Sequence, residues 1–388
     1  MSDHRFVMPE RTESITPFLV MDILERAKEM ETEGVDIVHL EVGEPDFDSP
    51  VFVRDAAKKA IDDGRTRYAP SLGLPQLRAA IAETYKSRYG INISPERVIL
   101  TSGSSPALQM VFASLLNPGD EVIMTDPHYA CYANFVRFFG GVPIFVRTCE
   151  ADNFRFSPSN IESKISEKTR AVLINSPENP TGAVMSSEDL DAISRLGVTI
   201  VSDEIYEGLV YDGADHSILE YSENAFVVNG FSKRYAMTGW RLGYLIVPEE
   251  FILPVRKLVQ NFFISAPTLS QWAGLAAIEG PGDDLAAMRD EFKKRRDFLL
   301  GGLEKIGLKV GSRPEGAFYV LVNVEKYTTD SLSFCNDLLE KALVAATPGV
   351  DFGDGGEGFI RLSYATSMER LEEGLKRIDR YLKSLVHS

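Results

Sequence analysis

A lysine and an aspartate each stand just beyond a short β-branched run, where a side chain can reach a ligand. Lys233 follows FVVNGFS and Asp203 follows VTIVS. A desolvated lysine loses its charge and becomes an amine that attacks carbonyls. A carboxylate in apolar surroundings needs a partner that offsets its desolvation, such as a protonated ring nitrogen. Taken singly they read as a surface charge and a helix N-cap, but together they predict carbonyl chemistry at one sheet edge.

Other strand-end residues supply groups for an anion and a flat ring. The turn TSGSSPAL (101–108) opens a helix and presents backbone N–H groups, hydroxyls and a positive helix end, which suits a phosphate. Arg241 adds a cation, Tyr129 offers a stacking surface, and the loop NSPENPTG leaves Asn179 free to donate hydrogen bonds. A Schiff-base lysine, a carboxylate, a phosphate cup, an arginine and an aromatic plate are what pyridoxal phosphate requires of its protein, so we predict this cofactor.

Composition and charge exclude several classes of binding partner. The 388 residues include 57 acidic and 41 basic ones, for a net charge of −16. Such a field repels polyanions, so we expect no nucleic-acid partner. Cys131, Cys149 and Cys335 lack the spacing of a zinc site, and we expect no metal and reduced thiols in a cytoplasmic protein. No run approaches the roughly 18 apolar residues of a membrane span, and none is expected.

Seven short apolar runs must position these side chains. They are RVIL (97–100), EVIMT (121–125), VPIFV (142–146), RAVLI (170–174), VTIVS (198–202), FVVN (226–229) and LGYLIV (242–247). Most are apolar on both faces, and their connections are long enough for crossovers. This predicts an α/β fold with a mainly parallel seven-stranded sheet sandwiched by helices. Ligands bind such sheets beyond the carboxyl ends of the strands.

The two ends of the chain predict a smaller α+β domain. Residues 249–279 and 283–304 read as long helices, followed by candidate strands at 318–323 and 359–363 and a terminal helix at 367–385. Residues 15–34 also have a helical apolar pattern and precede the strand-like DIVHL. We expect an N-terminal segment (1–46) that packs with the small domain, a large cofactor-binding domain (47–279) and a C-terminal small domain (280–388).

The run GFSKRYAMTGWRLG (230–243) resembles the lysine signature of class I/II aminotransferases, the fold-type I pyridoxal-phosphate enzymes. Other motifs in the family's order are VGEPDF (42–47), RYAPSLGLPQLR (67–78), SGSSPAL, NSPENPTG, SDEIY, GAFYV (316–320) and FIRLSYA (359–365). The chain looks most like bacterial and archaeal aspartate-aminotransferase-like members. The resemblance implies a homodimer that moves an α-amino group between an L-amino acid and a 2-oxo acid such as 2-oxoglutarate, by a ping-pong mechanism.

The resemblance also implies roles for residues at the cofactor ring. Lys233 should hold the cofactor as a Schiff base and, once freed by substrate, move a proton between the substrate Cα and C4′. Asp203 should pair with the pyridinium nitrogen. Tyr206 and Asn179 should hydrogen-bond the phenolic oxygen of the ring, and Tyr129 should stack on it. Lys233, Asp203 and Tyr206 are the expected catalytic residues.

A second set should hold the two anionic ends of the ligands. Gly103, Ser104, Ser105 and Arg241 should bind the phosphate, with Tyr68 reaching it from the neighbouring subunit. Arg361 should grip the substrate α-carboxylate through a bidentate pair, assisted by Gly43 and Asn179.

Two departures from the family pattern bear on the ligands. Gly230 stands where many members place a phosphate-binding hydroxyl, and the adjacent Ser232 need not replace it. Ser105 stands where aspartate-specific members have a lysine that reads the distal carboxylate, and Phe18 and Val20 stand near positions of small hydroxyl residues. We therefore predict a neutral amino acid substrate, such as alanine, an aliphatic or an aromatic one.

Alternatives remain open at this level. An aspartate aminotransferase and a pyridoxal-phosphate-dependent C–S lyase need nearly the same residues. The run GDGGEG (353–358) satisfies the G-x-G-x-x-G pattern of an NAD-type oxidoreductase. That motif must open a helix, whereas this run leads into strand-like FIRLSYA and carries two acidic residues, so we disfavour it.

Overall fold

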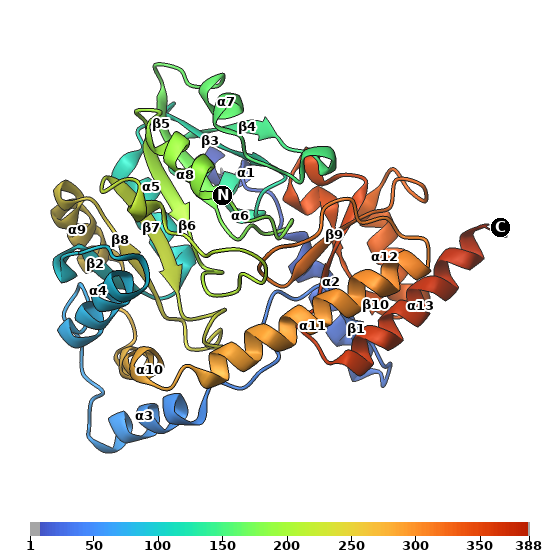
Figure 1. Ribbon diagram of the computed structural model, residues 1–388, viewed down its shortest axis with the longest axis horizontal. Helices are drawn as coiled ribbons and strands as arrows, with labels where there is room; N and C mark the ends of the chain where they lie inside the picture. Colours follow the sequence, from blue (N-terminus) through green and yellow to red (C-terminus); the bar gives the residue numbers. More distant parts are fainter. Residues whose placement is uncertain (1–7, 387–388) are drawn as a thin grey trace, which may run out of the picture.

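The computed structural model describes residues 8–386, and within them seven strands form one large sheet. The strands are β2 (Val98–Thr101), β3 (Glu121–Asp126), β4 (Val142–Arg147), β5 (Thr169–Asn175), β6 (Thr199–Asp203), β7 (Ala225–Gly230) and β8 (Gly243–Ile246). Their order is β2-β8-β7-β6-β5-β3-β4 (Figure 1). β8 runs antiparallel to both of its neighbours, and the other pairs are parallel. The predicted mainly parallel seven-stranded sheet is confirmed.

Helices cover both faces of this sheet. One face packs against α5 (Ser104–Leu115), α6 (Cys131–Phe138) and α9 (Ile252–Phe262). The other packs against α3 (Val51–Asp62), α4 (Pro75–Tyr89), α7 (Pro158–Glu162), α8 (Ser187–Ser194) and α10 (Thr268–Glu279). Along β3, Ile123 enters one apolar cluster while Val122 and Met124 enter the other. Successive side chains point to opposite faces, so a strand covered twice must be apolar throughout.

The strand register brings the ligand-binding loops to one edge. Asn175 lies opposite Asp203, the last residue of β6. Thr101 and Gly230, the last residues of β2 and β7, both lie opposite Gly243. The loops that follow these strands therefore emerge side by side.

A smaller group of elements lies on the right of Figure 1. Its antiparallel sheet has the order β11 (Thr347–Pro348), β12 (Phe359–Ser363), β9 (Tyr319–Asn323), and β1 (Val38–His39) pairs in parallel with β10 (Val344–Ala345). These strands share one core with α2 (Leu19–Thr32), α11 (Asp283–Lys305), α12 (Ser331–Ala342) and α13 (Met368–Val386). The first turn of helix, α1 (Glu10–Glu13), precedes α2. Both ends of the chain thus build this core. We propose domain boundaries at residues 46 and 279.

The prediction of one helix over 249–279 is wrong. The helix breaks between α9 and α10, where Ile264 has a φ of +67° and Pro267 precedes the new helix. Proline lacks the N–H that a continuous helix needs and disfavours helical backbone at the residue before it. For the same reason α2 starts at Leu19, after Pro17, rather than at residue 15. The helices predicted at 283–304 and 367–385 are confirmed as α11 and α13.

The GDGGEG run has the wrong setting for a dinucleotide. It follows the 3₁₀ turn Gly349–Phe352, contains the 3₁₀ turn Asp354–Gly356 and then leads into β12. A pyrophosphate would find neither a preceding strand-to-helix turn nor a helix N-terminus there. The reading as an NAD-type oxidoreductase is therefore excluded.

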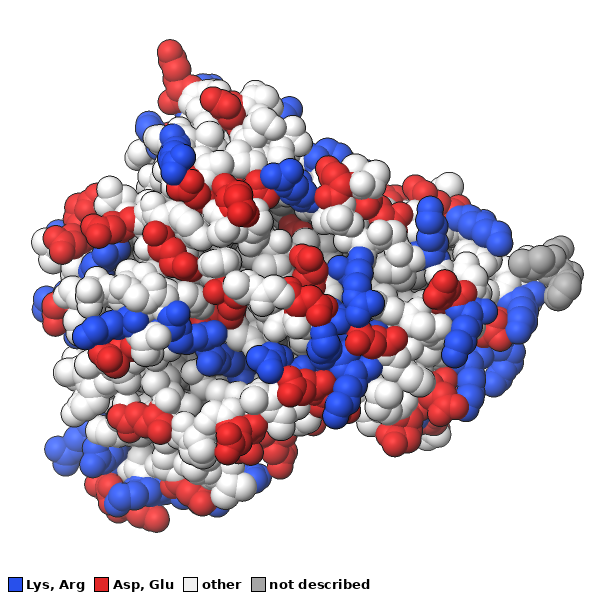
Figure 2. Space-filling model, viewed as in Figure 1, with Lys and Arg blue, Asp and Glu red and all other residues white. Residues whose placement is uncertain are grey.

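Charge is mixed over the surface. Figure 2 shows acidic and basic side chains interspersed on one face, with basic groups gathered over the middle of α11. An anionic ligand therefore depends on the charges of its own site. Across residues 8–386, every helix is too short or too polar to cross a membrane.

Candidate active site

A cavity of about 470 Å³ lies beyond the strand ends of the large sheet. Its walls come from the N-terminal segment, the loops after the large-sheet strands, and β9 and β12. Ten predicted site residues line it: Gly43, Ser104, Ser105, Tyr129, Asn179, Asp203, Tyr206, Lys233, Arg241 and Arg361. Folding therefore gathers into one volume side chains that the sequence spreads over more than 300 positions.

Lys233 enters the cavity from the loop after β7. Its Nζ donates a hydrogen bond to the backbone oxygen of Gly43 at 2.6 Å. Burial lowers the pKa of Lys233 to about 8, and the nearby charge of Glu44 opposes this effect. Because the neutral amine is the nucleophile, this shift prepares Lys233 for attack on a carbonyl.

Asp203 lies at the end of β6 and is buried. One carboxylate oxygen accepts a hydrogen bond from the Tyr132 hydroxyl at 2.7 Å, and the other accepts one from the backbone N–H of Ile205 at 3.1 Å. Burial raises the pKa of Asp203 to about 6, against these hydrogen bonds and the charge of Lys233. A cationic N–H in the cavity would offset that burial and hold the carboxylate ionised.

The N-terminus of α5 and Arg241 form an anion-binding corner. The first backbone N–H groups of α5 have no side-chain cap, since the N-cap residue is Gly103. Gly103 has a φ of +104°, and a Cβ there would lie 2.5 Å from Nη2 of Arg241. The absence of a side chain lets the guanidinium approach the helix end, where both attract a dianion.

Arg361 is a buried cation whose donors are only partly satisfied. It donates to Oδ1 of Asn179 at 2.9 Å, to the backbone oxygen of Glu41 at 2.6 Å and to Oγ1 of Thr347 at 3.1 Å. Its Nε is buried without a hydrogen-bond partner. The ring of Tyr319 packs 4.3 Å from the guanidinium carbon. A guanidinium held this rigidly with a spare donor suits a carboxylate ligand.

Aromatic side chains enclose the space between the two anion-binding ends. The hydroxyls of Tyr206 and Tyr319 are 2.9 Å apart, and burial raises the pKa of Tyr206 well above its usual range. Tyr129 makes edge contacts with Tyr132 and Phe18 at ring-centroid distances of 5.2 and 5.9 Å. Tyr206 thus remains a neutral hydrogen-bond donor.

Comparison with known proteins agrees with this geometry. Residues 35–378 match the family model of aminotransferase class I and II. The chain belongs to this aminotransferase family.

Individual relatives cover nearly the whole aminotransferase. It is 42% identical to a (5-formylfuran-3-yl)methyl phosphate transaminase of Methanocaldococcus jannaschii, across 97% of this chain and all of that one. It is 41% identical to an aspartate/prephenate aminotransferase of Thermus thermophilus, across 97% and 98% of the two chains. A solved structure of the Thermus thermophilus aspartate aminotransferase with maleate has a TM-score of 0.93 at 40% identity, across 97% and 100%. The protein is a fold-type I, pyridoxal-phosphate-dependent aminotransferase, as the sequence predicted.

The cavity of this aminotransferase fits its cofactor. Pyridoxal phosphate supplies an aldehyde that condenses with amines and a ring that withdraws electrons from the attached carbon. A phosphate matches the uncapped end of α5 beside Arg241. A pyridinium N–H matches Asp203. Lys233 is the cation that lowers the pKa of this buried carboxyl group, and a protonated ring nitrogen would add a second. The two ends of the site therefore have the charges that the two ends of the cofactor need.

Two predictions about the phosphate end have different outcomes in the aminotransferase. Tyr68 is 80% exposed and, within residues 8–386 of this single chain, takes no part in lining the cavity. A contribution of Tyr68 from a second subunit thus stays a prediction. A Cβ at Gly230 would lie 3.1 Å from both the Cα of Gly243 and the backbone oxygen of Leu242, so a larger residue there would require these neighbours to shift by a few tenths of an ångström. Ser232 lines the cavity.

Several residues of the aminotransferase site were missed by sequence reasoning. Tyr132 holds Asp203, Tyr319 contacts both Tyr206 and Arg361, and Thr347 holds Arg361. Tyr132 had a usable signal, since it follows Tyr129 by three residues, and its backbone N–H donates to the backbone oxygen of Tyr129 at 3.0 Å. The other two come from the small sheet, and their sequence motifs say nothing of their partners.

Proposed function

We propose that this aminotransferase takes its amino group from a neutral L-amino acid, such as alanine, an aliphatic or an aromatic one, and passes it to a 2-oxo acid such as 2-oxoglutarate. The observation that carries this proposal is the makeup of the cavity wall. Its apolar lining residues include Phe18, Val20, Met21, Leu24, Leu108 and Ile205. Within residues 8–386, the cations that line the cavity are Lys233, Arg241 and Arg361.

Each of these cations already has a task. Lys233 is the amine that attacks the carbonyl of the cofactor, Arg241 lies at the anion-binding corner that binds the phosphate, and Arg361 binds the substrate α-carboxylate. The β-carboxylate of an aspartate substrate would lie against apolar side chains, where an unpaired charge is expensive to desolvate. An apolar side chain instead gains roughly 25 cal/mol for each Å² removed from water. This balance favours neutral substrates.

The proposed roles follow from the geometry of each side chain. Arg361, oriented by Asn179 and Thr347, binds the α-carboxylate of each substrate. That grip directs the Cα hydrogen toward Lys233, whose lowered pKa lets it accept and return the proton. Asp203, oriented by Tyr132, keeps the ring nitrogen protonated. Tyr206 donates to the phenolic oxygen of the ring.

We also propose that the enzyme is a homodimer in which Tyr68 of one subunit reaches the phosphate of the other. The Thr268 hydroxyl donates to the backbone oxygen of Arg67 at 2.8 Å, which ties the Tyr68 loop to the start of α10. Shortly before α10, Phe262 and Ile264 are 63% and 48% exposed. Apolar exposure of this kind is typical of an interface between proteins.

We also propose a cytoplasmic location. The free cysteines Cys131, Cys149 and Cys335 support it, because thiols stay reduced in that compartment.

Aspartate is the second candidate substrate. The names of relatives near 40% identity favour it, since several are called aspartate or aspartate/prephenate aminotransferases. The β-carboxylate of aspartate would need a cation, and the described lining of one chain supplies none beyond the three already assigned. The acceptor 2-oxoglutarate also carries a second carboxylate, one methylene farther from its α-carboxylate, and we propose that this group extends past the apolar wall to the open side of the cavity.

A substrate panel tests the proposal. The kcat/KM values for alanine, leucine, phenylalanine, methionine and aspartate are measured with 2-oxoglutarate as the acceptor. We expect at least one neutral amino acid to exceed aspartate by about tenfold or more, the size of an unpaired polar group in an apolar site. An aspartate value well above all four neutral ones would overturn the proposed substrate class.

A further inference from the structure

The N-terminus of α2 is capped by a carboxylate from the other end of the chain. Oδ1 and Oδ2 of Asp351 accept hydrogen bonds from the backbone N–H groups of Leu19 at 2.9 Å and Val20 at 3.2 Å. The N-cap residue of α2, Phe18, provides no side-chain cap of its own. Asp351 is buried, so its contact with the positive helix end is shielded from water.

Asp351 belongs to the same short segment as a partner of Arg361. It lies in the 3₁₀ turn Gly349–Phe352, directly after β11, whose Thr347 holds the guanidinium. The Ser331 hydroxyl accepts the backbone N–H of Val350 at 3.1 Å, which fixes this turn to α12. Thr347, which holds Arg361, and Asp351, which caps α2, therefore lie in one short segment of the chain.

The first turns of α2 form an apolar wall of the active site. Phe18, Val20, Met21 and Leu24 all line the cavity. Before them, the backbone N–H of Thr16 donates to Oδ1 of Asn134 on α6 at 3.2 Å. Phe18 thus lies between the contact of Thr16 with α6 and the contact of Asp351 with the start of α2, and it packs edge-on against Tyr129 (Figure 1 shows α2 in the smaller group of elements).

We propose that Asp351 is a positioning residue for selection of the substrate side chain. Asp351 holds the start of α2 against the segment 347–352, which also holds Arg361. It therefore sets the distance between the bound α-carboxylate and the apolar wall. Large apolar side chains reach that wall, whereas the methyl group of alanine extends least toward it. Loss of the carboxylate therefore weakens binding of large apolar substrates selectively. This inference rests on the proposed preference for neutral amino acids.

The test compares Asp351→Ala and Asp351→Asn with Ser186→Ala in the holoenzyme. Ser186 is an exposed N-cap of α8, accepting the N–H of Asp189, so its loss removes a helix cap away from the cavity. We expect Asp351→Ala to lower the phenylalanine-to-alanine ratio of kcat/KM about fivefold, the effect of one lost cap, chiefly through KM for phenylalanine. Asp351→Asn keeps one acceptor oxygen and should show a smaller drop.

A second measurement separates positioning from general stability. Amide hydrogen exchange at residues 16–24 should accelerate in both Asp351 variants and stay unchanged in Ser186→Ala, while the visible absorbance of bound cofactor is retained in all three. An unchanged substrate ratio, or equal losses for phenylalanine and alanine, would overturn the role of Asp351. Preference for aspartate in the unsubstituted enzyme would overturn the proposed function instead, and hydrogen exchange with the phenylalanine-to-alanine ratio would still decide the role of Asp351.

Discussion

At the residue scale, burial shifts the two central ionisable groups in opposite senses. Burial lowers the pKa of Lys233 to about 8 and raises that of Asp203 to about 6. Both shifts favour the neutral form, because a charge is costly in a dry cavity. Asp203 would be held ionised by the cationic ring nitrogen of bound pyridoxal phosphate, and Lys233 in its neutral form would be the amine that attaches the cofactor.

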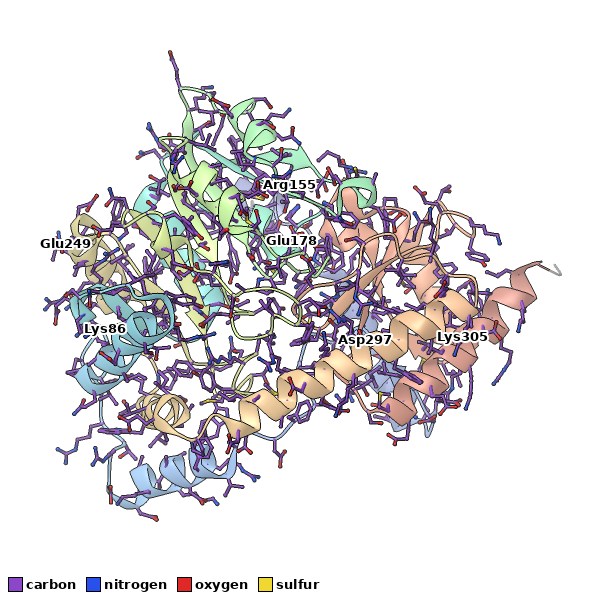
Figure 3. All side chains as sticks on the ribbon, viewed as in Figure 1. Lys86, Arg155, Glu178, Glu249, Asp297 and Lys305 are labelled. Carbon is purple, nitrogen blue, oxygen red and sulfur yellow. The ribbon has the colours of Figure 1, made fainter. Side chains whose placement is uncertain are left out.

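Replacement of Lys233 tests the nucleophile. Lys233→Ala should lose nearly all turnover, by roughly a thousandfold or more, because the covalent attachment and the proton transfer share one amine. The visible absorbance of the cofactor bound to lysine should disappear. Lys86→Ala is the matched control, since Lys86 is exposed on α4 at the far left of Figure 3. A competent Lys233→Ala enzyme would mean that another residue is the nucleophile.

At the element scale, the anion-binding corner depends on two backbone segments that meet closely. A Cβ on Gly243, the first residue of β8, would lie 2.7 Å from the carbonyl carbon of Gly103. The start of α5 therefore rests directly on the antiparallel strand of the sheet. This contact fixes the direction in which the N–H groups of the helix point.

Replacement of Gly103 tests that corner. Gly103→Ala adds a methyl group in a left-handed conformation and against the Arg241 guanidinium, so we expect the Kd for pyridoxal phosphate to rise about tenfold or more. Titration of the apoenzyme by absorbance measures this change. Gly119→Ala has a similar φ of +88° with no atom within 4 Å of the added carbon, and it serves as the control for backbone strain alone. Equal affinity in the two variants would contradict the assignment.

At the scale of the whole molecule, we propose that a second chain completes the site. Within one subunit, the side chain of Tyr68 is largely exposed to solvent. A residue that acts across an interface can be distinguished from one that acts within its own chain, because two inactive subunits then complement each other in a hybrid.

Hybrid dimers test the contribution of Tyr68. Subunits with Lys233→Ala and subunits with Tyr68→Ala are each expected to be impaired. Mixing them should restore about half the activity of the unsubstituted dimer in each hybrid, since one site then has an intact lysine and receives Tyr68 from its neighbour. Native mass spectrometry verifies that hybrids form, because the two substitutions change the subunit mass by different amounts. Hybrids with no gain in activity would show that Tyr68 does not act across the interface.

Buried carboxyl groups outside the cavity predict how stability depends on pH. Glu178, which lies near the junction of the two groups of elements in Figure 3, accepts hydrogen bonds from the hydroxyls of Thr125 and Thr181. Burial raises its pKa from 4.5 to about 7. The native state therefore binds this proton more tightly than the unfolded state, and the contribution of Glu178 to stability falls as pH rises from about 4.5 to 7.

Glu178→Gln should remove this part of the pH dependence. The free energy of unfolding in urea, measured with saturating cofactor between pH 5 and 7.5, should fall less steeply by up to ~3 kcal/mol across that range. The exposed Glu249, also labelled in Figure 3, provides the control variant Glu249→Gln. Parallel curves for Glu178→Gln and the unsubstituted enzyme would contradict the prediction.

The sequence by itself determined the class of sheet and the kind of chemistry. Strands covered on both faces must be apolar throughout, and parallel strands must end at one edge, so Lys233, Asp203 and Asn179 were predictable from position and residue type. Helix ends at 262 and 268 were missed although Pro267 marked them, because the surrounding apolar pattern is continuous.

Only the tertiary structure decided which side chains hold those groups. Tyr132 on Asp203, Tyr319 on Arg361 and Asp351 on the start of α2 join residues separated by 71, 42 and more than 330 positions. Local patterns report which face of a strand or helix is buried, but the partner across a contact depends on how whole elements pack. The character of the reaction was therefore readable from the chain, whereas the shape of the side-chain pocket arose from packing its two ends together.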